Sequence, residues 1–214
     1  TDFVFIDERT GETRLEKTPT TPRDLWEAIA RGLRKGGVEL RDVSMFIHGT
    51  TIGLNAFLEK KGRKTGLITT KGFRDVYEIG RHNRIDMYDL FYRKPAPLIP
   101  RDLRLEVDER VDHRGNVLVP LREEGVLDCV RVFRHAGVES VAVCLLHSYA
   151  TPDHEIRIGE ILAREFPEAA VSLSHALARE WREYERTSTT AINAYIMPTV
   201  SSYLSRIEES LAEL

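Results

Sequence analysis

Residues 140–147 read SVAVCLLH, and the apolar run over 141–146 within them predicts a buried β-strand. Amphipathic helical patterns flank this run over 121–136 and 152–166, and a second short strand is expected at 170–173. Strands that alternate with helices and are apolar on both faces are typical of α/β domains. The sequence therefore predicts an α/β fold in which helices flank a sheet of buried strands.

The rest of the chain continues this alternation, and residues 80–103 are expected to be irregular because they contain three prolines. The other expected elements are a hairpin of a buried strand 3–7 with 13–17, a helix ending at Gly36-Gly37, a strand over 43–48, a helix stopped at Gly62, a strand over 64–69, a helix near 73–79, a β-rich stretch over 103–119 turning at 114–116, and a helix over 180–214 broken at Pro198.

Composition excludes several classes of protein. The 214 residues contain 31 Lys and Arg against 34 Asp and Glu, a net charge of −3, which argues against a dedicated nucleic-acid surface. No apolar run approaches the roughly 20 residues of a membrane span. Cys129 and Cys144 are too few for a disulfide framework and are interpreted as packing residues, so a cytoplasmic location is expected. The seven histidines show no metal-ligand spacing.

Residues 48–55, which read HGTTIGLN, are the first candidate for chemistry. A strand that enters a small, hydroxyl-rich turn and then a helix presents free backbone N–H groups and the hydroxyls of Thr50 and Thr51. Such a helix start suits a phosphate, a carboxylate or a polarised carbonyl. The alternative is an ordinary capped helix, because Thr caps and Gly turns are common.

Residues 78–84 are the second candidate, a dense polar cluster that follows a helix. Arg81 and Arg84 could clamp an anion through bidentate hydrogen bonds, and His82 could move a proton near neutral pH. The alternative is a solvated loop. The nearby aromatic residues are interpreted as packing residues rather than a substrate cage; they are Tyr88, Phe91 and Tyr92.

Residues 179–190 are the third candidate, and they follow Ser174-His175. On a helix, Arg182 and Arg186 share one face, whereas Tyr184 shares another with Ser188. The alternative is that opposite charges three or four residues apart only stabilise the helix. A Ser–His–Asp arrangement is not supported, because no Gly-x-Ser-x-Gly elbow follows a strand.

These clusters belong to longer motifs through which the chain resembles the N-terminal part of the hydantoinase A / 5-oxoprolinase family, whose relatives include acetone carboxylase subunits. The similarity spans essentially all of the chain in the family's order. The motifs are 48–56, 67–81, 142–149, 173–175, 182–189 and 193–195, which read HGTTIGLNA, LITTKGFRDVYEIGR, AVCLLHSY, LSH, REYERTST and NAY.

The resemblance implies an actin-like, sugar-kinase-like (ribonuclease H-like) ATPase lobe with a mixed sheet, truncated at both ends. It divides the chain into an α/β domain over 1–178 and the helical start of the following domain over 179–214. It also implies ATP and Mg as cofactors, carbonyl activation by phosphorylation, and a cyclic amide such as hydantoin or 5-oxoproline as substrate. A B-type hydantoinase/oxoprolinase subunit and a homo- or hetero-oligomer are expected as partners, without nucleic acid or membrane.

The same resemblance raises the three clusters to candidate site residues. The expected catalytic residues are His48, Thr50, Thr51, Tyr184 and Glu185. The threonine hydroxyls would stabilise developing oxyanion charge, Glu185 would accept a proton or orient water, and Tyr184 would donate to the carbonyl. The expected substrate- or phosphate-binding residues are Asp2, Gly49, Arg81, Arg186 and Thr187.

The chain departs from the family pattern at its start. Family members begin with an Asp-x-Gly-Gly-Thr-x-Thr-Asp phosphate loop, and Thr1-Asp2 corresponds to the end of that loop. The isolated chain is therefore expected to bind ATP poorly and to turn over nothing. The alternatives are an ATP-dependent ketone carboxylase subunit, a non-catalytic lobe that docks the B-type partner, and a kinase-like enzyme that releases a phosphorylated product.

Overall fold

The computed structural model describes residues 1–19, 21, 25–82 and 86–212, which form two compact units. The first unit comprises Thr1–Thr51 together with Val200–Leu214, and the second comprises Ile52–Thr199. The long helix α7 (Glu183–Ala212) contributes to both units. It continues through Pro198, where the sequence predicted a break. The cost of an interior proline, a lost N–H and a clash with the preceding turn, is local, and the turns on either side keep the helix continuous.

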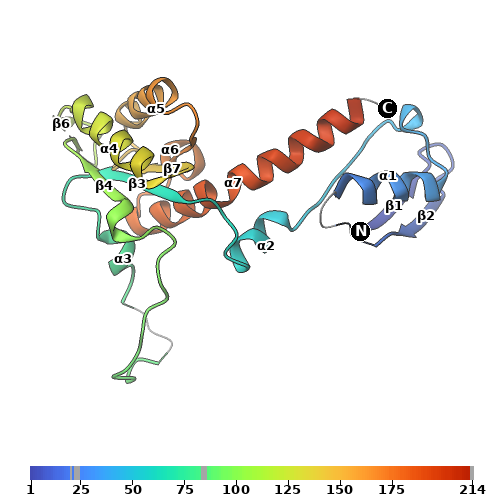
Figure 1. The fold of residues 1–214 in the computed structure, drawn as a ribbon, viewed down its shortest axis with the longest axis horizontal. Helices are drawn as coiled ribbons and strands as arrows, with labels where there is room; N and C mark the ends of the chain where they lie inside the picture. The colour runs from blue at the N-terminus through green and yellow to red at the C-terminus, as the bar shows by residue number, and fades with distance from the viewer. Residues whose placement is uncertain (20, 22–24, 83–85, 213–214) are drawn as a thin grey trace. The chain divides into compact units, whose positions relative to one another are not determined.

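The first unit contains an antiparallel strand pair and a helix (Figure 1). Its elements are β1 (Asp2–Ile6), β2 (Thr13–Lys17), α1 (Leu25–Gly36) and the 3-10 turn η1 (Leu40–Asp42). The rings of Phe3 and Phe5 lie against Gly32 and Gly36 of α1, so one face of β1 is covered. Val4 is exposed, so the expected buried strand is only half buried.

The expected strand over 43–48 is wrong. This segment has no regular structure and pairs with no strand among the described residues. A strand depends on a neighbour for its backbone hydrogen bonds, and the exposed side chains of Met45 and Ile47 also offer no buried face. The apolar residues of 43–48 were therefore not sufficient to predict a strand.

The second unit is built on a parallel sheet with the strand order β4-β3-β7-β8. These strands are β3 (Thr65–Thr70), β4 (Arg104–Val107), β7 (Ser140–Cys144) and β8 (Ala170–Leu173). The other elements are α2 (Ile52–Leu58), α3 (Val76–Ile79), the 3-10 turn η2 (Arg101–Leu103), β5 (Arg110–Val111), β6 (Val117–Val119), α4 (Glu123–Ala136), α5 (Asp153–Glu165) and α6 (Ser174–Leu177). The resemblance implied a mixed sheet; the described strands instead divide between this parallel sheet and two antiparallel pairs.

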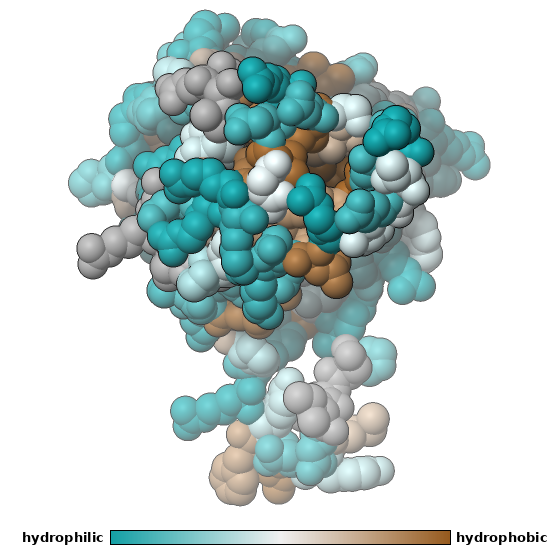
Figure 2. Space-filling view, turned by 90° about the vertical axis from the view of Figure 1, so that its right-hand side faces the viewer, coloured by the Kyte–Doolittle hydropathy of each residue, from teal (hydrophilic) through white to brown (hydrophobic). Residues whose placement is uncertain are grey.

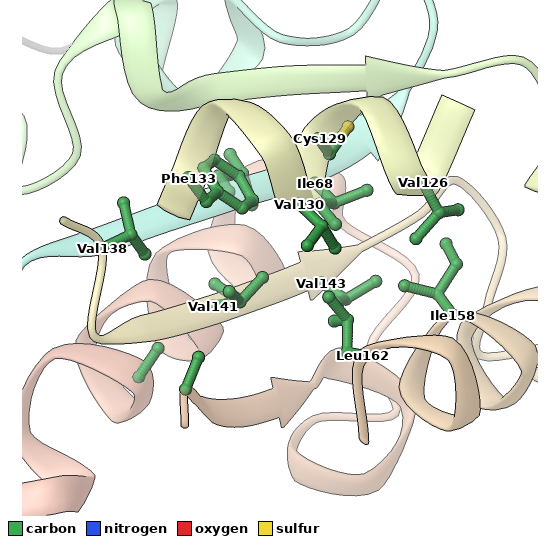
Figure 3. Packing of buried hydrophobic residues seen from close by; sticks show 14 of the residues in the cluster. Ile68, Val126, Cys129, Val130, Phe133, Val138, Val141, Val143, Ile158 and Leu162 are labelled. Atoms are coloured by element: carbon green, nitrogen blue, oxygen red, sulfur yellow. The ribbon is translucent and has the colours of Figure 1, made fainter. Parts of the chain in front are cut away.

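Helices cover both faces of this sheet, and the right-handed crossover rule determines which face α4 and α5 share. The chain moves in one direction from β4 to β7 and from β7 to β8, so α4 and α5 lie on the same face. Figure 3 shows Val130 and Phe133 of α4 directed toward the strands, with Leu162 of α5 beside Val143. Alternate residues of β7 point to the opposite face, where α7 packs its buried Ala191.

Candidate functional site

The carboxyl ends of β3 and β7 are where this topology places a ligand. The chain leaves β3 toward β4 and later returns to β7 on the other side of β3, which makes a topological switch point. Open α/β sheets bind ligands in the crevice outside such a point. In this unit the start of α7 covers the switch point. The Thr187 hydroxyl donates to the Glu183 carbonyl at 2.7 Å and lies 3.2 Å from Cys144 Sγ.

Arg186 is the most constrained of the predicted site residues, with only 1% of its surface exposed. Its guanidinium donates to the carbonyls of Glu180 at 2.7 Å and Leu145 at 2.5 Å, and lies 5.5 Å from the ring centre of Tyr149. Its Nε has no hydrogen-bond partner among the described residues. A buried N–H without an acceptor costs free energy, so Nε is a donor that an oxygen of a bound molecule would satisfy.

The cavity beside Arg186 is small. It is lined also by Thr69, Cys144 and Thr187, and its volume of about 10 Å³ is near the minimum that holds one water molecule. A larger ligand can reach Nε only if the first turns of α7 or the loop after β3 move. The predicted role of Arg186 in anion binding stays a prediction.

Two buried carboxylates brace the same edge of the sheet. Glu155 of α5 accepts hydrogen bonds from the Leu145 N–H at 2.9 Å, from the Ser174 hydroxyl at 2.6 Å, and from both the backbone N–H, at 2.9 Å, and Nδ1, at 2.8 Å, of His175. Glu109 accepts from the Thr70 hydroxyl, and its other oxygen lies 2.8 Å from Nδ1 of His154. These bonds tie the start of α5 to the ends of β3, β7 and β8.

Neither carboxylate lies in a sequence motif that pointed to a function. A signal for Glu155 does exist, because it shares a face of α5 with Ile158 and Leu162, which are buried core residues. A glutamate that falls on the apolar face of a helix is expected to be buried and to have hydrogen-bond partners there. Glu109 lies between two short strands, where no periodicity marks it.

A strained turn follows β7. His147 has a φ of +57°, a left-handed conformation that is uncommon for a residue with a side chain. Its Nδ1 lies 3.1 Å from the Tyr149 hydroxyl, and burial together with the nearby Arg186 charge lowers the pKa of its imidazole. This histidine is therefore neutral at neutral pH and faces the same group of residues as Arg186.

Arg81 contacts Tyr184 and Glu185 in the second unit, and their catalytic and binding roles stay predictions. Arg81 forms a bidentate ion pair with Glu185, with N···O distances of 2.9 and 2.5 Å, and its guanidinium lies 5.8 Å from the ring centre of Tyr184. The Arg81 hydrogen bonds lower the pKa of Glu185, so this carboxylate is ionised and is a weak base while the pair persists. Gly80 has a φ of +55° and packs on Tyr184.

The other predicted residues belong to the first unit, and all except Asp2 lie in the segment before α2. His48 Nε2 lies 2.5 Å from the hydroxyl of Tyr203, which also forms a hydrogen bond with the Thr50 side chain. Gly49, Thr50 and Thr51 are exposed. Asp2 begins β1 and lies 3.2 Å from Lys17 Nζ in an exposed ion pair. The catalytic and binding roles proposed for these residues stay predictions.

The expectations about the cysteines and the loop aromatic residues have different outcomes. Cys129 and Cys144 are buried, which confirms them as packing residues. Tyr88 and Phe91 are almost fully exposed, so their interpretation as packing residues is wrong: their irregular loop has no sheet or helix face to cover. Arg84 lies outside the described residues.

The described residues fit an oxygen ligand at Arg186 Nε, but they do not form a complete site for ATP and Mg. A triphosphate requires a run of free backbone N–H groups. In the turn after β3, the N–H of Gly72 already donates to Glu106 at 2.8 Å, and that of Phe73 donates to the Thr70 carbonyl at 3.1 Å. Within the described ranges no three His, Cys, Asp or Glu residues group as metal ligands.

None of the described helices is long and apolar enough to cross a membrane. The predicted domain boundary at 178/179 stays a prediction.

The sequence is similar to several characterised proteins. It is 35% identical to caprolactamase subunit alpha of Pseudomonas jessenii over 100% of this chain and 32% of that protein. It is 37% identical to 5-oxoprolinase 1 of Arabidopsis thaliana over 73% of this chain and 14% of that enzyme. It is 28% identical to the acetone carboxylase beta subunit of Xanthobacter autotrophicus over 100% of this chain and 32% of that subunit.

Solved structures match the fold as well. The ATP-dependent caprolactamase from Pseudomonas jessenii superposes with a TM-score of 0.89, at 35% identity, over 99% of this chain and 32% of that chain. Nucleotide-free acetone carboxylase superposes with a TM-score of 0.87, at 29% identity, over 99% of this chain and 32% of that chain. This chain thus spans about a third of the length of these two proteins. The sequence profile of the hydantoinase/oxoprolinase N-terminal region matches residues 1–166, and the chain belongs to that family.

Proposed function

We propose that this chain is the N-terminal part of an ATP-dependent enzyme that opens a cyclic amide, such as a hydantoin, 5-oxoproline or a related lactam. ATP would supply the phosphoryl group that turns the carbonyl oxygen into a leaving group. The proposal includes the actin-like ATPase lobe implied by the resemblance. It is supported by relatives named caprolactamase and 5-oxoprolinase at 35% and 37% identity, one of which is titled ATP-dependent.

The observation that carries the proposal is the group of polar side chains at the carboxyl ends of β3 and β7. Arg186 Nε offers an unpaired donor to a carbonyl or phosphoryl oxygen, and buried hydrogen bonds hold the rest of the guanidinium in place. Once the covering segment has moved to admit the substrate, a donor held in this way would stabilise the negative charge that develops on the oxygen. The adjacent Arg81–Glu185 pair could exchange partners when an anionic substrate arrives, releasing Glu185 to orient water.

A second subunit belongs to this proposal. Two of the relatives are named as subunits, of caprolactamase and of acetone carboxylase, and this chain covers 32% of each. The same chain accounts for only 14% of 5-oxoprolinase 1, which is therefore the longer polypeptide. We propose that the full-length protein works with a B-type subunit whose counterpart is fused in the longer enzyme.

The alternative function is ATP-dependent carboxylation of a ketone. It is favoured by the TM-score of 0.87 with acetone carboxylase, although at 29% identity. A non-catalytic docking lobe is less well supported, because Arg81, Tyr184 and Glu185 do come together within one unit.

The deciding experiment measures ADP release by the full-length protein with its B-type subunit. Separate assays present 5-oxoproline, hydantoin, caprolactam, and acetone with bicarbonate. We expect release that depends on one of the cyclic amides. Release that depends only on acetone with bicarbonate would assign the carboxylase function, and a stable phosphorylated product would instead indicate a kinase.

A further inference from the structure

Two buried carboxylates of the second unit each hold a histidine. Hydrophilic side chains cover much of the molecular face shown in Figure 2 (teal), and an exposed charged residue marks no site by itself. The side chains of Glu109 and Glu155 differ, because they are 0% exposed and each lies 2.8 Å from an imidazole Nδ1. The imidazoles belong to His154 and His175, which are 13% and 15% exposed. A carboxylate bonded to Nδ1 orients an imidazole for proton transfer at Nε2.

The hydrogen bonds of Glu155 fix the tautomer of His175. Glu155 contacts four donors, which are the Leu145 N–H, the Ser174 hydroxyl, and both the N–H and Nδ1 of His175. All four contacts are satisfied when Glu155 is ionised, because an ionised carboxylate only accepts hydrogen bonds. Nδ1 then carries the hydrogen, and the neutral imidazole keeps its lone pair on Nε2.

Nε2 of His175 is open to a bound molecule. It has no hydrogen-bond partner among the described residues, and the buried side-chain atoms that lack a partner there are both arginine nitrogens. Solvent therefore reaches Nε2. The nearest serines do not use it: Ser174 Oγ donates to Glu155 at 2.6 Å and lies 3.0 Å from Ser148 Oγ, and both serines are buried. The lone pair is thus available to water or to a substrate rather than to a serine nucleophile.

A backbone link connects this imidazole to Arg186. Leu145 follows β7, its N–H donates to Glu155 at 2.9 Å, and its carbonyl accepts from Arg186 Nη2 at 2.5 Å. One residue therefore holds both the carboxylate that orients His175 and the arginine proposed to bind a carbonyl or phosphoryl oxygen. Both groups lie at the carboxyl ends of the strands, which is the edge where open α/β sheets bind ligands.

The other carboxylate–imidazole pair has a less direct link to this turn. His154 contacts Glu109, which accepts from the Thr70 hydroxyl, and that hydroxyl in turn accepts the Leu146 N–H at 2.9 Å. A metal-binding role for His175 is not supported either. No three His, Cys, Asp or Glu residues group as metal ligands in the part of the chain that the structure describes, whereas protein metal sites combine several such ligands.

We propose that His175 is the general base of ring opening, which takes a proton at Nε2 from the water that attacks the activated carbonyl carbon. This inference rests on the proposed function. It adds a catalytic residue to which the sequence motifs gave no role.

The proposed step balances its protons as follows. The water oxygen bonds to the carbon of the phosphorylated carbonyl, and one water proton moves to Nε2. Glu155 stabilises the imidazolium that forms. The C–N bond of the ring then breaks with its electron pair on nitrogen, which takes that proton from the imidazolium. The second water proton leaves to solvent as the carbonyl forms again, and a second water molecule hydrolyses the remaining acyl phosphate to carboxylate and phosphate.

The test follows two steps separately in the full-length protein with its B-type subunit. Amino-acid product formation reports ring opening. Substrate-dependent positional isotope exchange in ATP, labelled at its β,γ-bridging oxygen, reports phosphoryl transfer. The variant His175→Asn keeps an N–H donor in the place of Nδ1 for Glu155 and has no counterpart of Nε2. We expect kcat for ring opening to fall at least about 100-fold, while isotope exchange and the unfolding midpoint stay unchanged.

The matched control is His154→Asn, which removes the imidazole of the other pair and should change ring opening less than about threefold. Equal losses in both variants would show that the two pairs only brace the strand ends, and would overturn the proposal. Ring opening by His175→Asn within about threefold of the wild type would do the same, as would an equal loss of isotope exchange. If His175→Asn does not fold, His175→Gln is measured with the same expectation.

The wild-type pair separates this proposal from the function on which it rests. Wild-type protein that opens none of the cyclic amides would refute the proposed function and the role of His175 together. An active wild type whose His175 variants keep their activity would refute the role of His175 alone.

Discussion

Gly66 of β3 allows Phe133 of α4 to pack directly on the central strand, and adding one methyl group there should destabilise the protein. A Cβ on residue 66 would lie 2.5 Å from Phe133 Cε1 and 2.6 Å from its Cζ. Carbon atoms in contact sit about 3.5–4.0 Å apart, so the ring would have to retreat by about 1 Å. Phe133 is fully buried in the core cluster and has no free space to enter.

Overpacking of this kind costs about 1–3 kcal/mol, whereas Gly→Ala at an ordinary backbone position gains about 0.5–1 kcal/mol. We therefore expect Gly66→Ala to lower the free energy of unfolding by about 1–2 kcal/mol in urea titrations followed by circular dichroism. Gly125→Ala in α4 is the control, because its nearest neighbour, Val107 Cγ1, would be 3.9 Å away. It should be neutral or stabilise by about 0.5 kcal/mol.

The steric origin is tested by combining Gly66→Ala with Phe133→Leu, which removes the ring atoms that collide. The double variant should be at least about 1 kcal/mol more stable than the sum of the single effects predicts. If Gly66→Ala is neutral, or if the two effects add, the close packing of Phe133 on β3 is not what limits this position.

Three further predictions concern buried and paired groups. Glu155→Leu leaves four donors without their acceptor and should destabilise the fold by about 3 kcal/mol or more, whereas Glu160→Leu on the exposed side of α5 should leave the urea midpoint unchanged. Burial raises the pKa of the Cys129 thiol to about 12 from 9.0. The unfolded thiol therefore loses its proton first, so stability should fall as pH rises from about 9 toward 12, and less steeply in Cys129→Ala. In the complete enzyme, Arg81→Ala and Glu185→Gln should each lower kcat at least about tenfold without moving the unfolding midpoint; unchanged turnover would reduce this exposed pair to a surface contact.

Periodicity predicted most of the second unit, because buried strands and amphipathic helices leave strong patterns. The strands at 64–69 and 140–147 are confirmed in type, although β7 already ends at Cys144. The run continues through Leu145 and Leu146, which are buried as well, so hydrophobicity alone does not mark the strand end. Pairing does, because the last β8 partner is opposite Val143 and the last β3 partner, Thr69, is opposite Cys144.

The first unit was harder to predict because strand formation depends on pairing, which the composition of a segment does not reveal. Residues 43–48 have the composition of a strand, yet a strand exists only where a partner supplies hydrogen bonds, and composition does not report partners. Phe91 illustrates the same point. Its apolar side chain predicted a packing residue, yet it is almost fully exposed because no neighbouring element covers it. Local pattern thus describes what a residue prefers, and the tertiary neighbours decide whether that preference is met.

In the candidate site, sequence motifs indicate the exposed charged residues but not the buried carboxylates that hold them in place. Arg81, Tyr184 and Glu185 stood out because they cluster in charged motifs, and they meet in space through exposed bonds that a ligand can replace. Glu155 and Glu109 drew no assignment, but they fix the ends of three strands through buried bonds that nothing can replace without large cost. Glu155 accepts the Leu145 N–H, and the Leu145 carbonyl in turn accepts from Arg186, so this predicted site residue is positioned by a buried frame that only the structure displays. A substitution in that frame should therefore lower stability first, whereas one at the rim should lower turnover alone.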